Sequence, residues 1–127
     1  MKIEGKELTR AEEQIMQILW DIGKGFVKDV LQQLPAPRPA YSTVSTIIRI
    51  LVQKGYVGYK AYGKTHEYFP LVSREAYRAY TAKKLLDNYF DRSVGSLVSF
   101  FADKKKINGR EADEIIQLLK NLKKEQK

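Results

Sequence analysis

The chain has 127 residues, 43% of them hydrophobic, and its 23 Lys and Arg against 15 Asp and Glu give a formal net charge of +8. This size suits one globular domain or a small domain with an appendage, and the absence of cysteine excludes disulfides and thiolate metal sites. The single histidine, His66, leaves no histidine cluster for a metal or a catalytic triad, so we expect no cofactor and no metal.

Membrane and enzyme functions find little support in the sequence. No apolar run approaches the length of a membrane-spanning helix, and the first ten residues, MKIEGKELTR, lack the apolar core of a signal peptide. We therefore expect a cytoplasmic protein without membrane insertion. The carboxylate pairs Glu12-Glu13 and Asp113-Glu114 have no nucleophile, metal set or glycine-rich phosphate loop to work with, so an enzyme is disfavoured.

The positive charge is concentrated where acidic residues are missing. Between Asp29 and Glu67 there is no acidic residue, and this window of 37 residues contains Arg38, Arg49, Lys54, Lys60 and Lys64. A local positive field of this extent is typical of a surface that binds nucleic acid. A generally basic protein would show the same net charge, but it would not need the acid-free window.

Two helices are predicted in the first 35 residues. Thr9 followed by Glu12 is a capping-box signature, so a helix should begin near Arg10. A short second helix fits Val27–Leu34, and the proline-rich segment 35–39 ends it because proline cannot continue a helix.

The segment Ser42–Lys54, STVSTIIRILVQK, predicts the helix around which the chain is organised. At 3.6 residues per turn its apolar and polar residues fall on opposite faces. The apolar face holds Val44, Ile47, Ile48 and Leu51, and the polar face holds Ser42, Thr46, Arg49 and Gln53. The polar groups can hydrogen-bond to base edges in the major groove, whereas an ordinary amphipathic helix would leave them in solvent. Gly55 predicts the C-cap, and the helix begins either at Ser42 or a turn earlier near Ala40.

A two-stranded hairpin is predicted after this helix. The runs YVGYKAY and THEYF are aromatic and β-branched, and Gly63-Lys64 between them suits a type II′ turn. Helices followed by a basic-tipped hairpin give the order of a winged helix. Lys60 and Lys64 should contact phosphates or the minor groove, whereas His66 is more simply an exposed strand residue.

The remainder of the chain is predicted to be helical. Ser73 caps a helix through about Phe90, a short helix follows over 94–102, and Asn108 with Glu111 caps a last helix. Soluble monomers seldom expose so many large apolar groups, so two chains should interlock here as a symmetric homodimer on an inverted-repeat operator. The alternative is that these helices pack back on their own winged domain. The expected dimer residues are Tyr77, Tyr80, Leu85, Leu86, Tyr89, Phe90, Leu97, Phe100, Phe101, Ile115, Ile116, Leu119 and Leu122.

Four stretches resemble, in the same order, the penicillinase-repressor (BlaI/MecI/CopY) family of bacterial transcriptional regulators. They are LTRAEEQIMQILW (8–20), TVSTIIRILVQKGYV (43–57), GKTHEYFPLVS (63–73) and GSLVSFFADKK (95–105). The resemblance implies a winged-helix DNA-binding domain, a helical dimerisation domain and repression at inverted-repeat operators. It implies that Thr43, Ser45 and Thr46 contact bases. It also implies, for the penicillin-sensing branch, that a membrane sensor protease cuts the chain, here between Phe100 and Phe101.

The chain departs from the family pattern at several positions. Family members commonly have Arg where this chain has Ile50, and here Arg49 carries the charge one position earlier. Pro39 and Ala40 stand where members often have Trp before the recognition helix, and Phe100 replaces the Asn that precedes the cleaved bond. The cysteine pairs of copper-sensing members are absent, which excludes thiolate copper sensing.

We therefore predict a mainly α protein, with a winged helix-turn-helix domain over 1–72 that carries a β-hairpin wing, followed by a three-helix dimerisation domain over 73–127. The function expected is that of a dimeric repressor bound to a double-stranded DNA operator. Proteolysis in the dimerisation domain is the expected route by which the repressor would be released from DNA. The alternative is a winged-helix protein-interaction scaffold that does not bind DNA. The expected DNA-binding residues are Arg38, Tyr41, Ser42, Thr43, Ser45, Thr46, Arg49, Lys54, Lys60 and Lys64.

Overall fold

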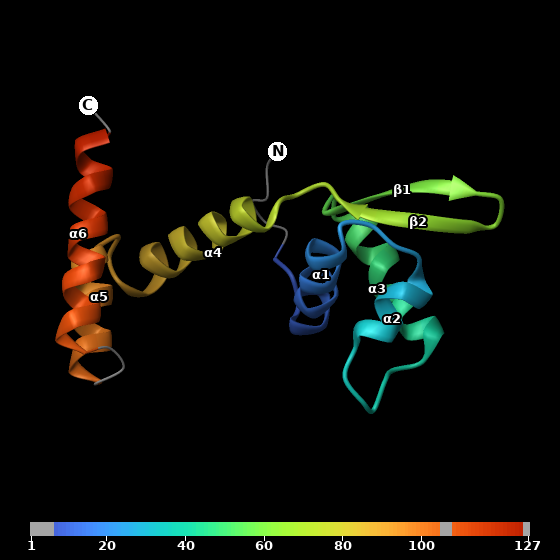
Figure 1. Cartoon of the computed structure of the whole chain (residues 1–127), viewed down its shortest axis with the longest axis horizontal. Helices are drawn as coiled ribbons and strands as arrows, with labels where there is room; N and C mark the ends of the chain where they lie inside the picture. The colour runs from blue at the N-terminus through green and yellow to red at the C-terminus, as the bar shows by residue number, and fades with distance from the viewer. Residues whose placement is uncertain (1–6, 105–107, 126–127) are drawn as a thin grey trace. The chain divides into compact units, whose positions relative to one another are not determined.

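The computed structural model describes residues 7–104 and 108–125, which form six helices and one β-hairpin (Figure 1). In chain order these are α1 (Arg10–Ile22), α2 (Val27–Gln33), α3 (Tyr41–Gln53), β1 (Val57–Tyr62), β2 (Thr65–Pro70), α4 (Arg74–Tyr89), α5 (Val94–Asp103) and α6 (Gly109–Glu125). The predicted fold class, mainly α with a hairpin wing, is confirmed. None of the helices in the described ranges is long and apolar enough to cross a bilayer.

The chain divides into two compact units, Met1–Tyr80 and Thr81–Lys127, and the division falls within α4. We call them the winged unit and the C-terminal unit. The first turns of α4 therefore belong with α1, α2, α3 and the hairpin. Each unit is described separately below.

The first helix begins where the sequence predicts. The Thr9 hydroxyl accepts a hydrogen bond from the Glu12 N–H at 3.2 Å, and the Glu12 carboxylate accepts one from the Thr9 N–H at 2.8 Å. This reciprocal capping box satisfies amide groups that have no partner within the helix. At the other end Gly23 has φ +82° and donates to the Leu19 carbonyl at 2.8 Å.

The recognition helix α3 is bounded by Ala40 as N-cap and Lys54 as C-cap. Of the two starts that the sequence left open, the earlier one is therefore observed. Gly55 follows the C-cap with φ +84°, a conformation that glycine adopts without steric cost. Its N–H donates to Val52 and the Tyr56 N–H donates to Leu51, both at 3.0 Å. This Schellman motif ends the helix and turns the chain towards β1.

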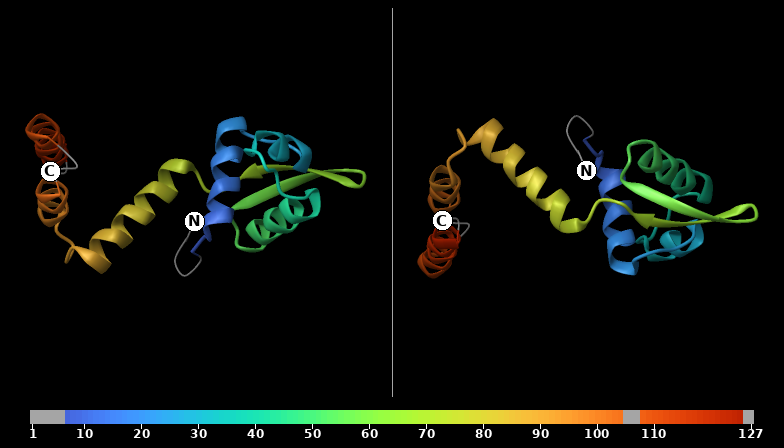
Figure 2. Two further views of the ribbon diagram at one scale, coloured as in Figure 1. Left: turned by 90° about the horizontal axis from the view of Figure 1, so that it is seen from below. Right: turned by 90° about the horizontal axis from the view of Figure 1, so that it is seen from above.

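The hairpin pairs β1 with β2 in antiparallel register from Val57↔Pro70 to Tyr62↔Thr65. Gly63 has φ +63° whereas Lys64 has no positive φ, as a type II′ turn requires. Gly25 forms a β-bridge to Tyr68, so the segment between α1 and α2 adds a third, one-residue edge to the sheet. The hairpin extends past the helices α1–α3, and its turn lies away from the helical core (Figure 2).

The core of the winged unit is built from one side of each helix and from the base of the wing. The fully buried side chains are Met16, Leu19, Val30, Val44, Ile48, Leu51, Tyr56 and Val57. From α3 these include Val44, Ile48 and Leu51, while Ile47 is half-buried. Burying each of these aliphatic side chains contributes about 1.5–3 kcal/mol, so the apolar face of α3 is firmly anchored. Its opposite face must then point outward.

The C-terminal unit contains the end of α4, followed by α5 and α6. Asp91 and Arg92 end α4 with φ of +48° and +62°, and the Ser93 hydroxyl caps α5 by accepting from the Ser96 N–H at 3.0 Å. Asn108 and Glu111 form the predicted reciprocal cap of α6. Over residues 81–104 and 108–118 no described side chain is buried. The described side chains of this unit therefore form no enclosed core within the single chain.

Candidate nucleic-acid interface

The outward face of α3 presents polar groups that the helix does not need for its own packing. Tyr41 is 55% exposed, and Ser42, Thr43, Thr46 and Arg49 are exposed as well. Ser45, on the flank of this face, is half-buried. These residues are among those expected to contact DNA, but they do not all lie on one side of α3. Tyr41, Ser45 and Arg49 line a cavity towards the wing, whereas Thr43 lines a pocket on the opposite flank, together with Val44 and Ile47.

The hydrogen bonds already made on α3 limit what each group can offer to a partner. The Thr46 hydroxyl donates to the Ser42 carbonyl one turn earlier at 2.9 Å, so its oxygen faces outward as an acceptor. Ala40 provides no side-chain cap at the start of the helix. The Thr43 N–H already donates to the Ala40 carbonyl at 3.1 Å, so the Tyr41 and Ser42 amide groups supply the donor capacity with which helix N-termini hold phosphates.

The wing adds exposed cations. Lys60 and Lys64 are both exposed, and the Lys60 ammonium lies 5.3 Å from the ring centroid of Tyr62. His66 was expected to be an exposed strand residue, and this expectation is wrong. It is half-buried because its imidazole stacks on Tyr59 at 4.4 Å between ring centroids, with an interplanar angle of 10°.

A cavity of about 460 Å³ lies between α3, the start of α2 and the wing. Arg49 and Lys64 line it from α3 and from the hairpin turn, and Lys28 lines it from α2. Burial raises the pKa of Tyr68 in its wall, while the positive charge of Arg49 opposes that rise. Nothing in the sequence marks Lys28 as a binding residue, because Asp29 follows it directly and it lies before the acid-free window.

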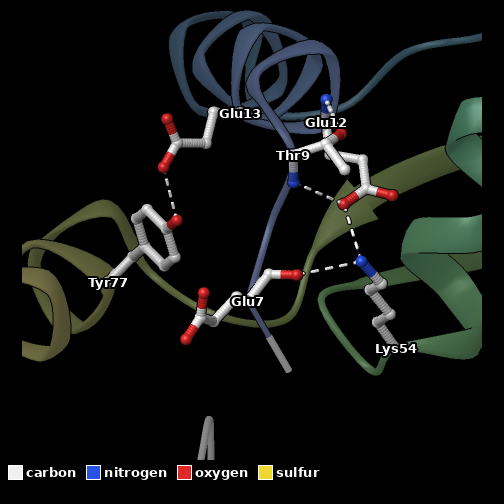
Figure 3. A network of polar contacts seen from close by, with 6 residues as sticks. All are labelled: Glu7, Thr9, Glu12, Glu13, Lys54 and Tyr77. Carbon is white, nitrogen blue, oxygen red and sulfur yellow. Dashed lines mark hydrogen bonds and ion pairs between the residues drawn. The ribbon is translucent and has the colours of Figure 1, made fainter. Parts of the chain in front are cut away.

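Lys54 was expected among the DNA-binding residues, but its ammonium lies against the start of α1 (Figure 3). Its ammonium lies 2.7 Å from a carboxylate oxygen of Glu12 and donates to the Glu7 carbonyl at 2.9 Å. Lys54 thus ties the end of α3 to the start of α1. We therefore leave it out of the proposed phosphate contacts.

Glu12 is the buried partner in this network, with 7% of its side chain exposed. Burial alone would raise the pKa of its carboxyl group, but the hydrogen bonds from Lys54 and from Thr9 outweigh burial and hold the pKa below its ordinary value. The carboxylate is therefore ionised at neutral pH, and its charge stabilises the contact between the two helices.

Arg38 also makes contacts within the chain. Its guanidinium donates to the Leu34 carbonyl at 3.1 Å and to the Gln32 carbonyl at 2.9 Å. These are carbonyl groups at the C-terminal end of α2, where a cation is favourable. Arg38 therefore caps α2, and we expect at most a minor contact with DNA.

Tyr77 is 8% exposed and belongs to the core of the winged unit rather than to a dimer surface. Its hydroxyl donates to the Glu13 carboxylate at 2.5 Å (Figure 3), and its ring contacts Trp20 and Tyr56, both at 5.8 Å between centroids. Burial and this hydrogen bond raise the pKa of Tyr77 far above its ordinary value. Tyr80 packs against the same core. We therefore leave Tyr77 and Tyr80 out of the proposed dimer surface.

The other expected dimer residues lie in the C-terminal unit. Of these, Leu85, Tyr89, Phe100, Phe101 and Ile116 are exposed, whereas Leu86, Phe90, Leu97 and Ile115 are half-buried. The side chains of Leu119 and Leu122 lie outside those that the structure describes. The Phe100 ring contacts those of Phe90 and Phe101, at 5.6 and 5.7 Å between centroids.

Three helices, a basic two-stranded wing and the bridge from the α1–α2 segment define the winged unit as a winged helix-turn-helix domain. A family profile described as Penicillinase repressor matches residues 8–121, and the chain belongs to this family. The family is one of transcriptional repressors and not of enzymes.

Individual relatives agree with this assignment. The chain is 25% identical over 114 residues to the "Methicillin resistance regulatory protein MecI" of Mammaliicoccus sciuri, which covers 89% of this chain and 93% of the relative. It is 24% identical over 123 residues to the "Penicillinase repressor" of Bacillus licheniformis, covering 94% and 96%. Among solved structures, that of the DNA-binding domain of the repressor BlaI aligns with a TM-score of 0.50 and 22% identity, covering 60% of this chain and 92% of that one. This alignment supports the winged-helix fold.

Proposed function

We propose that the protein is a transcriptional repressor that binds double-stranded DNA through the outward face of α3. One observation carries the proposal: the apolar face of α3 is buried while its polar face is exposed, in a window of the chain that contains no acidic residue. Membership of the penicillinase repressor family supports the same function. A polyanion is the partner that such a surface fits.

The recognition helix α3 and the wing make different contacts with DNA in this proposal. Arg49 donates two hydrogen bonds to a guanine, while the hydroxyl groups of α3 contact neighbouring base edges. Tyr41 and the first amide groups of α3 face a phosphate. Lys60 and Lys64 of the wing bind the flanking phosphates and so fix the register of the helix without reading the sequence. The hydroxyl groups meant here are those of Ser42, Thr43, Ser45 and Thr46.

A homodimer formed by the C-terminal unit completes the proposal. The support is that no described side chain of this unit is buried, although α5 carries Leu97, Phe100 and Phe101. Covering these groups with a second copy removes apolar surface from water and makes a homodimer core. A two-fold axis then presents two recognition helices to an inverted repeat. Release by a membrane sensor protease that cuts between Phe100 and Phe101 inside the cytoplasm is part of this proposal.

The test begins with the salt dependence of DNA affinity. Anisotropy of a labelled duplex selected from a random pool should give a log Kobs that falls linearly with log salt, because bound phosphates release counterions. A scaffold that does not bind DNA would show no saturable binding even at low salt. Sedimentation equilibrium should give twice the chain mass of 14.7 kDa. A monomeric mass at every concentration would refute the dimer.

A further inference from the structure

The cavity between α3 and the wing has the size and the lining of a small-molecule site. Its volume of about 460 Å³ lies within the range of about 300–1,000 Å³ typical of ligand pockets. We propose that it binds a small organic anion that carries a flat ring, and that its occupation excludes DNA from α3. The second half of this proposal rests on the function proposed above.

The positive charge of the residues that line the cavity favours an anionic ligand. Lys28, Arg49 and Lys64 reach the cavity from three different elements, and no acidic residue is among those that line it. Asp29, the nearest acid along the chain, directs its carboxylate to the Phe26 N–H at 2.8 Å. The guanidinium of Arg49 can hold a carboxylate by two parallel hydrogen bonds.

The aromatic side chains in the walls of the cavity favour a ligand with a flat ring. Phe26, Tyr41 and Tyr68 line the cavity together with the imidazole of His66. His66 is held in place between Tyr59, on which it stacks, and Tyr68, at 6.0 Å between centroids. Aromatic side chains favour a flat ligand by offset or edge contacts. A small anion without a ring would use only the cations.

Occupation of the cavity and binding of DNA compete for the same groups. Arg49, Ser45 and Tyr41 line the cavity and also belong to the proposed DNA-contacting face. A guanidinium that holds the ligand's carboxylate cannot also hold a guanine. The bound ligand therefore lowers the affinity of the protein for DNA. By linkage, bound DNA lowers the affinity for the ligand by the same factor.

Direct binding can be measured on the full chain without DNA. Ligand-observed NMR with benzoate, benzamide and acetate compares ring plus charge, ring alone and charge alone at one ionic strength. Benzoate should bind with a dissociation constant on the order of 1 mM, and the other two at least tenfold more weakly. Equal binding of benzamide, or no binding of benzoate, would overturn the assignment.

Two variants locate the site. Lys28→Gln removes a lining cation and should weaken benzoate about fivefold. Lys24→Gln is the matched control, because Lys24 is an exposed lysine of the same segment that does not line the cavity. If both variants bind benzoate like the unmodified chain, the ligand lies elsewhere and the assignment is lost.

Competition is tested by adding benzoate to the complex with labelled DNA at constant ionic strength. At ten times its own dissociation constant it should raise the apparent dissociation constant for DNA about elevenfold, whereas acetate at the same concentration should not. Unchanged DNA affinity with benzoate bound would refute the exclusion. If the chain binds benzoate but no DNA, the proposed function fails while the site stands. If it binds DNA but not benzoate, the reverse holds.

Discussion

The substitution of Lys54 tests whether this lysine stabilises the fold or binds a phosphate of DNA. Lys54→Gln removes an ammonium that lies 2.7 Å from the Glu12 carboxylate and 2.9 Å from the Glu7 carbonyl. Removing one partner of a fully buried ion pair costs about 3–5 kcal/mol, whereas exposed pairs contribute about 0.2–1 kcal/mol. The side chain of Lys54 is 28% exposed and that of Glu12 is 7% exposed. We therefore expect a loss of about 2 kcal/mol in the free energy of unfolding.

Two measurements on this variant separate a structural role from a DNA-binding role. Urea unfolding followed by the fluorescence of Trp20, the single tryptophan of the chain, gives the stability of the winged unit at a fixed protein concentration. The slope of log Kobs against log salt counts the phosphates that are neutralised. For Lys54→Gln the stability should fall and the slope should stay unchanged.

Lys64→Gln is the matched control, because Lys64 is an exposed lysine at the tip of the wing. Its stability should be unchanged, and its salt slope should become shallower by about 0.9 for each unit bound, which is about 1.8 for the dimer. A slope that is shallower by this amount in Lys54→Gln as well, with unchanged stability, would show that Lys54 faces a phosphate and that its contact with Glu12 is dispensable.

Three further predictions concern bases, dimerisation and pH. Arg49→Ala should cost about 1–3 kcal/mol at the selected operator and much less on scrambled DNA, and anisotropy with both duplexes checks this difference. Phe101→Asp should turn the dimer into a monomer in sedimentation equilibrium, because it places a charge in the apolar surface that we expect to be covered. Glu12→Gln should be less stable than the unmodified chain at pH 7. Because the folded-state pKa of Glu12 lies below its ordinary value of 4.5, the ion pair contributes above that value, and the difference should vanish as the pH falls through the lowered pKa. Urea unfolding at a series of pH values measures it.

The parts of the fold that the sequence predicted are those governed by short-range physical chemistry. The capping box joins Thr9 and Glu12, which are three positions apart, and the positive φ of Gly55 and of Gly63 is required by a helix end and by a two-residue turn. The alternation of apolar and polar residues on α3 likewise follows from the helical period alone. Such signals need no knowledge of distant parts of the chain.

The parts that the sequence could not predict depend on long-range contacts. Lys54 meets Glu12 across 42 residues, and Tyr77 meets Glu13 across 64. No spacing rule links such positions, so the sequence predicts a DNA contact for a lysine in an acid-free window and a dimer contact for a tyrosine on a helix with apolar residues around much of its circumference. The cavity between α3 and the wing arises in the same way, from three elements that are separate in the sequence.

Because the proposed interface uses two phosphate-binding lysines on each winged unit, dimerisation would control repression. If Lys60 and Lys64 each neutralise one phosphate, the salt slope is about −1.8 for one unit and about −3.6 for two. With so few phosphate contacts, we expect one unit alone to bind DNA weakly at physiological salt. Joining two units makes the second binding event intramolecular and raises the affinity by about 10²–10⁴ without a new contact. Any change that separates the C-terminal units, including a cut within α5, would then release the operator while α3 itself stays unchanged.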